Sequence, residues 1–129
     1  MANRSIVHVE FSTKDAPASA KFYSELFGWE MHEMPEFNYW TFATGPEQGG
    51  GFNPVGDNVG GGFDVKPGTV VTYVMSEDID ADLAKAESLG GTTKAPKMEI
   101  PGIGWYGVFE DPSGNLVGLY TGMPRPAEG

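Results

Sequence analysis

The sequence contains no cysteine in 129 residues and only two histidines. Without a thiol, the chain forms no disulfide and has no thiolate nucleophile. Structural zinc sites need four ligands drawn mainly from Cys and His, and this composition does not provide them. These scarcities exclude disulfide-stabilised folds, cysteine-dependent enzymes and zinc-finger-like domains.

Basic residues are also scarce, because eight Lys and Arg stand against eighteen Asp and Glu, for a formal net charge of −10. Nucleic acids and anionic membranes are held by Lys and Arg on phosphate, so we expect neither as a partner. No apolar run approaches the length of a membrane span, and the N-terminal MANRSIV lacks the apolar core of a signal peptide. These absences predict a cytoplasmic protein.

The chain does contain enough apolar residues for a core, since 40% are hydrophobic, including three Trp, five Tyr and eight Phe. Its length corresponds to one domain. Nineteen Gly and ten Pro indicate many tight turns between short elements. We therefore expect one strand-rich domain.

The segment IVHVEFSTKD, residues 6–15, raises the first functional question. It alternates as a β-strand does, so that Ile6, His8 and Glu10 share one face and Phe11 lies on the other. A histidine on a strand is a common metal ligand and also a common structural residue. Whether His8 belongs to a metal site therefore depends on its neighbours.

The two halves of the chain repeat one order of elements. In the first half, a strand is followed by a helix that Asp15 caps and Gly28 ends. In the second half, a strand is followed by a helix capped by Asp78 or Asp80, and an offset of 63 residues pairs Asp15 with Asp78. Three strands are expected after each helix, at 29–34, 39–44 and 49–55, and at 92–100, 105–111 and 115–121. The pattern predicts an α+β fold with two βαβββ units.

We expect a single domain over residues 1–129. Unit one spans about 5–55, a Gly-rich linker about 55–68, unit two about 69–122, and a disordered tail 123–129. The linker has no Lys-Ser/Thr ending and no helix directly after it, so it is not expected to bind phosphate.

Two longer motifs carry a resemblance to a known family. HVEFSTKDAPASAKFYSELFGWE near the start and FEDPSGNLVGLY near the end resemble the vicinal oxygen chelate superfamily, which is glyoxalase/bleomycin-resistance/dioxygenase-like. The chain is most similar to small bacterial proteins related to lactoylglutathione lyase, over roughly residues 5–122. The resemblance implies two tandem βαβββ units that form a cupped mixed β-sheet around a ligand cavity. It also implies a homodimer, since the family often pairs units across chains.

The resemblance further implies four inward side chains, from the first and last strand of each unit, that hold a divalent metal. His8 stands at the first of these positions, and Val71 and Gly118 stand at two others. The remaining position falls near Gly51 or Phe52. One ligand of four does not make a stable site, so we expect no cofactor and no standard metal centre. A nonstandard divalent site that uses His8, Glu10 and a third donor stays open.

The expected cup offers other chemistry. A neighbouring imidazole and carboxylate, His8 and Glu10, can act as general acid and base; alternatively, both are satisfied structural residues. The strand at 104–110 turns either Trp105 and Phe109 or Tyr106 and Val108 inward. The residues expected to contact a ligand are His8, Glu10, Tyr73, Met75, Trp105 and Tyr120.

Three functional hypotheses follow. The first is a metal-independent protein that binds a small organic ligand. The second is an enzyme related to lactoylglutathione lyase, a lyase or isomerase that transfers a proton next to a carbonyl with Glu10 or His8 as base. The third is a dimerising module with an empty cup.

Overall fold

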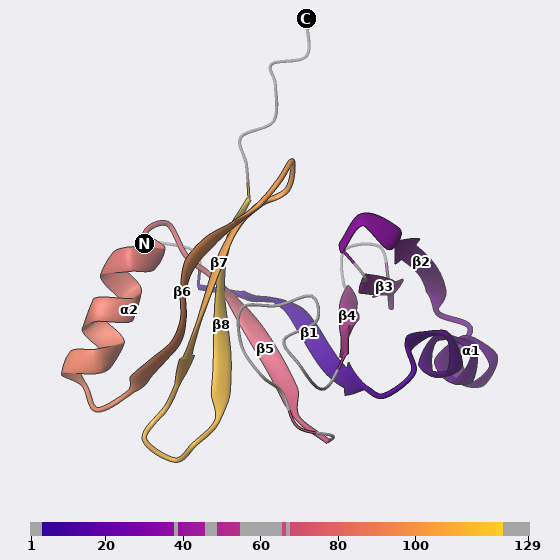
Figure 1. The fold of residues 1–129 in the computed structure, drawn as a ribbon, viewed down its shortest axis with the longest axis horizontal. Helices are drawn as coiled ribbons and strands as arrows, with labels where there is room; N and C mark the ends of the chain where they lie inside the picture. Colours follow the sequence, from indigo (N-terminus) through magenta and orange to yellow (C-terminus); the bar gives the residue numbers. More distant parts are fainter. Residues whose placement is uncertain (1–3, 38, 46–48, 55–65, 67, 123–129) are drawn as a thin grey trace, which may run out of the picture. The chain divides into compact units, whose positions relative to one another are not determined.

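The computed structural model describes residues 4–37, 39–45, 49–54, 66 and 68–122 (Figure 1). Most of the expected linker and the whole expected tail lie outside these residues. The elements follow in the order β1 (Ile6–Thr13), α1 (Ala16–Phe27), β2 (Glu30–Met34), a 3-10 turn (Pro35–Phe37), β3 (Tyr39–Ala43), β4 (Gly49–Pro54), β5 (Val70–Met75), α2 (Ile79–Ser88), β6 (Thr92–Ile100), β7 (Gly104–Glu110) and β8 (Leu116–Gly122). The predicted α+β class and the repeated βαβββ order are confirmed. Within the described residues, neither helix is both long and apolar enough to cross a membrane.

The chain packs as two compact modules. The first module is residues 6–73, and the second is residues 1–5 with 74–129. These modules cut across β5, so they do not coincide with the two βαβββ units. A single domain with the expected unit boundaries stays a prediction.

In the first module the strand order is β2-β3-β4-β1-β5. The pairs β2–β3 and β3–β4 are antiparallel, whereas β1 and β4 run parallel with Glu10 opposite Gly51 and Phe11 opposite Phe52. The sheet is therefore mixed. Its parallel pair joins the first and last strands of the first βαβββ unit.

One face of this sheet carries an aromatic core under α1. Phe42 and Phe52 are buried beside Ala20, and Phe11, Tyr23, Trp29, Met31 and Trp40 pack around them. The rings stack closely, with centroids 4.8 Å apart for Trp29 and Phe42 and 5.1 Å apart for Phe42 and Phe52. Because Phe11 points to this core, the alternating residues His8 and Glu10 point to the opposite face, as predicted.

In the second module, β6, β7 and β8 form an antiparallel ladder that α2 covers on one face (Figure 1). Ile79 and Leu83 of α2 pack on Leu119, with Trp105 and Phe109 beside them. Gly107 permits this close approach, since a Cβ there would lie 2.9 Å from Ile79 Cγ2.

This packing decides the facing of β7, which the sequence left open. Trp105 and Phe109 lie on the face that α2 covers. Tyr106 and Val108 alternate to the other face, where their cross-strand partners are Tyr120 and Gly118. Trp105 therefore does not share a face with Tyr120.

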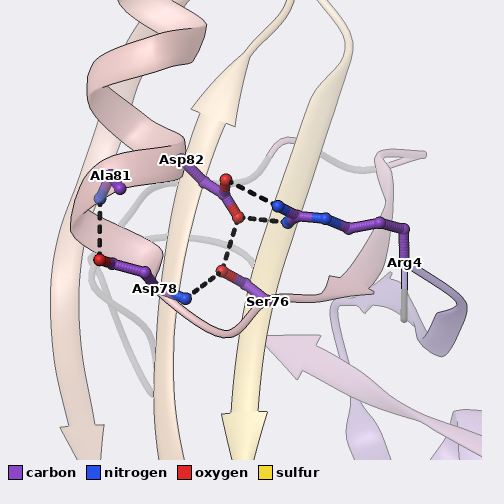
Figure 2. A network of polar contacts seen from close by, with 5 residues as sticks. All are labelled: Arg4, Ser76, Asp78, Ala81 and Asp82. Carbon is purple, nitrogen blue, oxygen red and sulfur yellow. Dashed lines mark hydrogen bonds and ion pairs between the residues drawn. The ribbon is translucent and has the colours of Figure 1, made fainter. Parts of the chain in front are cut away.

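The two helices begin alike. Asp15 accepts a hydrogen bond from the backbone N–H of Ala18 at 3.1 Å, and Asp78 accepts one from Ala81 at 3.0 Å (Figure 2). Both cap residues have extended backbone, as an N-cap requires. The open choice between Asp78 and Asp80 is resolved in favour of Asp78.

The residues two positions before the caps repeat as well. Thr13 and Ser76 accept hydrogen bonds from the N–H groups of the two cap residues at 3.1 and 3.2 Å. In the second module, the Ser76 hydroxyl also donates to Asp82 at 2.6 Å, and Asp82 pairs with both terminal guanidinium nitrogens of Arg4 (Figure 2). The Arg4 guanidinium holds the pKa of Asp82 below its ordinary value.

Asp78→Ala is expected to lower the free energy of unfolding by about 1 kcal/mol, because the N–H of Ala81 loses its acceptor. Urea denaturation measures this loss. Asp80→Ala is the matched control, since Asp80 is an exposed aspartate in the same helical turn. Equal losses in the two variants would show that charge near the helix start, and not the cap, is responsible.

Candidate functional site

A polar cluster lies on the face of the first module opposite its aromatic core. It is built from His8 and Glu10 of β1, Tyr39 of β3, Asn53 of β4 and Tyr73 of β5. On β1, β3 and β4, these residues alternate with Phe11, Phe42 and Phe52 and therefore point away from the aromatic core. Tyr73 of β5 reaches the same face, because its phenol donates to Glu10. Four strands therefore contribute to one site.

Glu10 is the centre of this cluster and is only 7% exposed. Tyr39 Oη donates to its Oε2 at 2.7 Å, and Tyr73 Oη donates to its Oε1 at 3.0 Å. The side chain of Asn53 makes a third hydrogen bond. The ion pairs found among the described residues, Arg4–Asp82 and Lys94–Glu110, do not include Glu10. Hydrogen-bond donors therefore stabilise this carboxylate.

Burial raises the pKa of Glu10, and the hydrogen bonds from Tyr39, Tyr73 and Asn53 oppose that rise. Burial, followed by the charge of Glu10, also raises the pKa of the Tyr39 phenol well above its ordinary value. Tyr39 consequently keeps its proton near neutral pH and can act as a donor.

His8 adjoins the carboxylate through Tyr39. Its Nε2 lies 2.9 Å from Tyr39 Oη, and its ring meets the Tyr73 ring edge-on with centroids 5.5 Å apart. Burial lowers the pKa of His8 to about 4, so the imidazole is neutral at pH 7. The cluster thus combines a neutral imidazole, two phenols and a carboxyl group.

Tyr39 can reach Glu10 because Gly51, which lies between them, has no side chain. Strand β4 lies between β3 and β1, and Gly51 stands opposite Glu10 in it. A Cβ at residue 51 would lie 1.9 Å from Tyr39 Oη and 2.2 Å from its Cζ. The phenol therefore occupies the space that a side chain at residue 51 would fill.

The structure brings together three of the predicted site residues, His8, Glu10 and Tyr73. Sequence reasoning did not identify Tyr39 and Asn53 as partners of Glu10. A signal for Tyr39 was present, because the run Gly49-Gly50-Gly51 leaves room for a side chain to cross that strand.

The other predicted site residues, Met75, Trp105 and Tyr120, belong to the second module. Tyr120 Oη donates to the carbonyl of Ile103 at 3.4 Å. Met75 continues β5, and its N–H donates to the carbonyl of Ser5 at 2.9 Å. Trp105 packs against the apolar group of Ile79, Leu83 and Leu119.

The described residues do not fit the four-ligand metal site that the resemblance implies. Val71 is an apolar residue with 1% exposure, Gly118 has no side chain, and the Tyr39 phenol fills the space above Gly51. Both Glu10 oxygens accept hydrogen bonds from phenols. Across residues 4–37, 39–45, 49–54, 66 and 68–122, no three His, Cys, Asp or Glu side chains form a group that could hold a metal ion.

Comparison with known proteins shows the family of this chain. The profile described as the Glyoxalase/Bleomycin resistance protein/Dioxygenase superfamily matches residues 5–119. The Mycobacterium bovis protein CFP32, provisionally named a glyoxylase, is 30% identical over 113 residues, which are 87% of this chain and 43% of that protein. The anthracycline biosynthesis protein DauV of Streptomyces sp. strain C5 is 29% identical over 131 residues, covering 92% of this chain and 48% of that protein.

The chain spans about half the length of these curated relatives. Among solved structures, the hypothetical protein BH1468 of Bacillus halodurans superposes with a TM-score of 0.70 at 10% identity, covering 99% of this chain and 100% of that one. This likeness shows the glyoxalase-like fold, and the family profile covers nearly the whole chain. The chain belongs to the glyoxalase/bleomycin resistance protein/dioxygenase superfamily.

Proposed function

We propose that this chain binds a small organic ligand without the standard four-ligand metal centre. The observation that carries the proposal is the hydrogen-bonded cluster of His8, Tyr39, Glu10 and Tyr73. The cluster has an imidazole at one expected metal position, His8, and its two phenols come from residues outside the expected metal set. Such a group can orient the polar part of a ligand, whereas apolar surface supplies affinity.

The ligand class that best suits this cluster is an aromatic molecule with polar substituents. Phenol and imidazole rings contact flat ligands well, and their polar atoms hydrogen-bond to hydroxyl or carbonyl groups. A relative named for anthracycline biosynthesis is in keeping with this class. The proposal also includes a contact from Tyr73 to the ligand, a homodimer and a cytoplasmic location.

A proton-transfer enzyme is the second candidate, and the environment of Glu10 favours it. A buried carboxyl group with a raised pKa beside a neutral imidazole is suited to move a proton near neutral pH. In this reading Glu10 is the base, and the reaction is that of a lyase or isomerase. If Glu10 is the base, Glu10→Gln should abolish a measured turnover. Unchanged turnover would show that Glu10 is not the base.

Two measurements test the binding proposal. Elemental analysis of the purified protein should find no stoichiometric Zn, Ni, Fe or Mn, and added metals should not raise its melting temperature. Calorimetric titration with 1,2-dihydroxyanthraquinone, a flat polyhydroxylated probe, should detect binding that His8→Ala weakens about three- to tenfold, the loss of one hydrogen bond.

His32→Ala is the matched control, because His32 is the other histidine and is exposed on β2. Binding by this variant should equal that of the wild type. One tightly bound equivalent of metal that disappears in His8→Ala would overturn the metal-independent reading. Equal affinities of wild type and His8→Ala would remove the cluster from the proposed binding site.

A further inference from the structure

We propose that Tyr39 is a positioning residue: it holds His8 as the Nε2–H tautomer and leaves Nδ1 as a hydrogen-bond acceptor for the ligand. The first part concerns the protein without ligand and stands on the geometry of the cluster. The second part rests on the proposed binding function.

The tautomer follows from the protons available to Tyr39. A phenol has one O–H, and the Tyr39 O–H donates to Glu10 Oε2 at 2.7 Å. The same oxygen lies 2.9 Å from His8 Nε2, so the proton in that second contact comes from the imidazole. The chain of donors therefore runs from His8 Nε2–H to Tyr39 and from Tyr39 O–H to Glu10.

The arrangement of Glu10 supports this direction. Its two oxygens receive separate phenols, and Asn53 adds a further hydrogen bond. These hydrogen bonds oppose the rise that burial causes in the pKa of Glu10, and they favour its ionised form, which only accepts hydrogen bonds. A protonated Glu10 could instead donate to Tyr39 and reverse the chain, which would give His8 the opposite tautomer.

The other nitrogen of His8 is then available. Among the hydrogen bonds of the described residues, His8 contributes only Nε2. No side-chain nitrogen or oxygen in the described ranges is both buried and without a partner, and the His8 side chain is half-buried. We therefore infer that Nδ1 can be reached by a ligand. A neutral Nδ1 accepts hydrogen bonds and cannot donate them.

This arrangement selects a class of ligand. An accessible imidazole acceptor favours ligands that present a hydroxyl, phenol or N–H group. The neighbouring buried carboxylate of Glu10 disfavours carboxylate and phosphate groups at the same place, because like charges repel strongly in a desolvated site. The site is therefore expected to prefer neutral or cationic donors over anions.

The experiment uses ¹⁵N-labelled protein of the full chain with His32→Gln, which leaves His8 as the only histidine. At pH 7 the ¹H–¹⁵N spectrum should show a His8 Nε2–H signal that is protected from exchange with water, and an unprotonated Nδ1. A His8 ring protonated at Nδ1 alone, or at both nitrogens, would overturn the proposal.

Two variants test the role of Tyr39. In Tyr39→Phe, the protected Nε2–H signal should be lost, since the ring remains but its oxygen is gone. Gly51→Ala should have the same effect with Tyr39 intact, because the added Cβ would lie 1.9 Å from Tyr39 Oη and displace it. Retention of the protected signal in both variants would refute the positioning role.

Tyr73→Phe is the matched control, since it also removes a phenol donor from Glu10 but leaves His8 Nε2 and Tyr39 in contact. The protected signal should persist in this variant. Its loss there to the same extent as in Tyr39→Phe would assign the effect to general loosening of the cluster.

The ligand part is tested with matched probes, 1,2-dihydroxyanthraquinone and anthraquinone-2-carboxylate. The hydroxylated probe should bind at least about tenfold more tightly, and its affinity should fall in Tyr39→Phe. Equal or tighter binding of the carboxylate would overturn the selectivity. If neither probe binds while the Nε2–H signal is present, the proposed function fails and the positioning role of Tyr39 stands.

Discussion

Phe52→Ala is expected to lower the free energy of unfolding by about 3–5 kcal/mol. Phe52 is only 1% exposed. Its ring centroid lies 5.1 Å from that of Phe42, 5.7 Å from that of Tyr23 and 6.3 Å from that of Phe11. Truncation leaves a cavity among three rings, and rigid aromatic neighbours cannot close it fully.

A loss of this size is a large share of the stability of a small domain, so the transition should move to much lower urea concentration. Phe22→Ala is the matched control, because Phe22 is 59% exposed on α1. Phe22→Ala should lower the free energy of unfolding by less than about 1 kcal/mol. A Phe52→Ala loss no greater than that of Phe22→Ala would contradict the aromatic core described for the first module.

The second large effect is on the pH dependence of stability. From pH 7 to pH 4, the free energy of unfolding of the wild type should fall by about 3 kcal/mol more than that of His8→Gln. Burial lowers the pKa of His8 in the folded protein to about 4, whereas the imidazole of the unfolded chain titrates near 6.5. Between these values the unfolded state binds a proton that the folded state does not bind. Stability is therefore lost as the pH falls through this window.

Glu10 acts in the opposite sense, because its pKa is raised on folding. It therefore stabilises the folded protein more at low pH than at high pH. Comparison with His8→Gln keeps Glu10 in both proteins and isolates the histidine. Urea denaturation at half-unit pH steps measures the difference. His32→Gln is the matched control, because it replaces the other histidine, which is exposed, and leaves His8 in place. Parallel curves for wild type and His8→Gln would show that His8 is not buried as a neutral ring.

The sequence by itself determined the local structure and three of the five residues of the cluster. Alternation in residues 6–11 places His8 and Glu10 on one face, and this depends only on the two-residue period of a strand. The offset of 63 residues gives Tyr73 the same position as Glu10 in the second repeat, and the two side chains are hydrogen-bonded. The helix starts at Asp15 and Asp78 follow from side chains that satisfy nearby N–H groups.

Only the tertiary structure decided which residues complete the site. Tyr39 lies on β3, two strands away from Glu10, and their contact depends on the parallel pairing of β1 with β4 and on the space above Gly51. The facing of Trp105 likewise depends on which side of β7 the helix α2 covers. Strand order and register are set by contacts between distant segments, whereas periodicity and capping act within a few residues. For that reason the sequence identified His8 and Glu10, and the fold supplied Tyr39 as the residue between them.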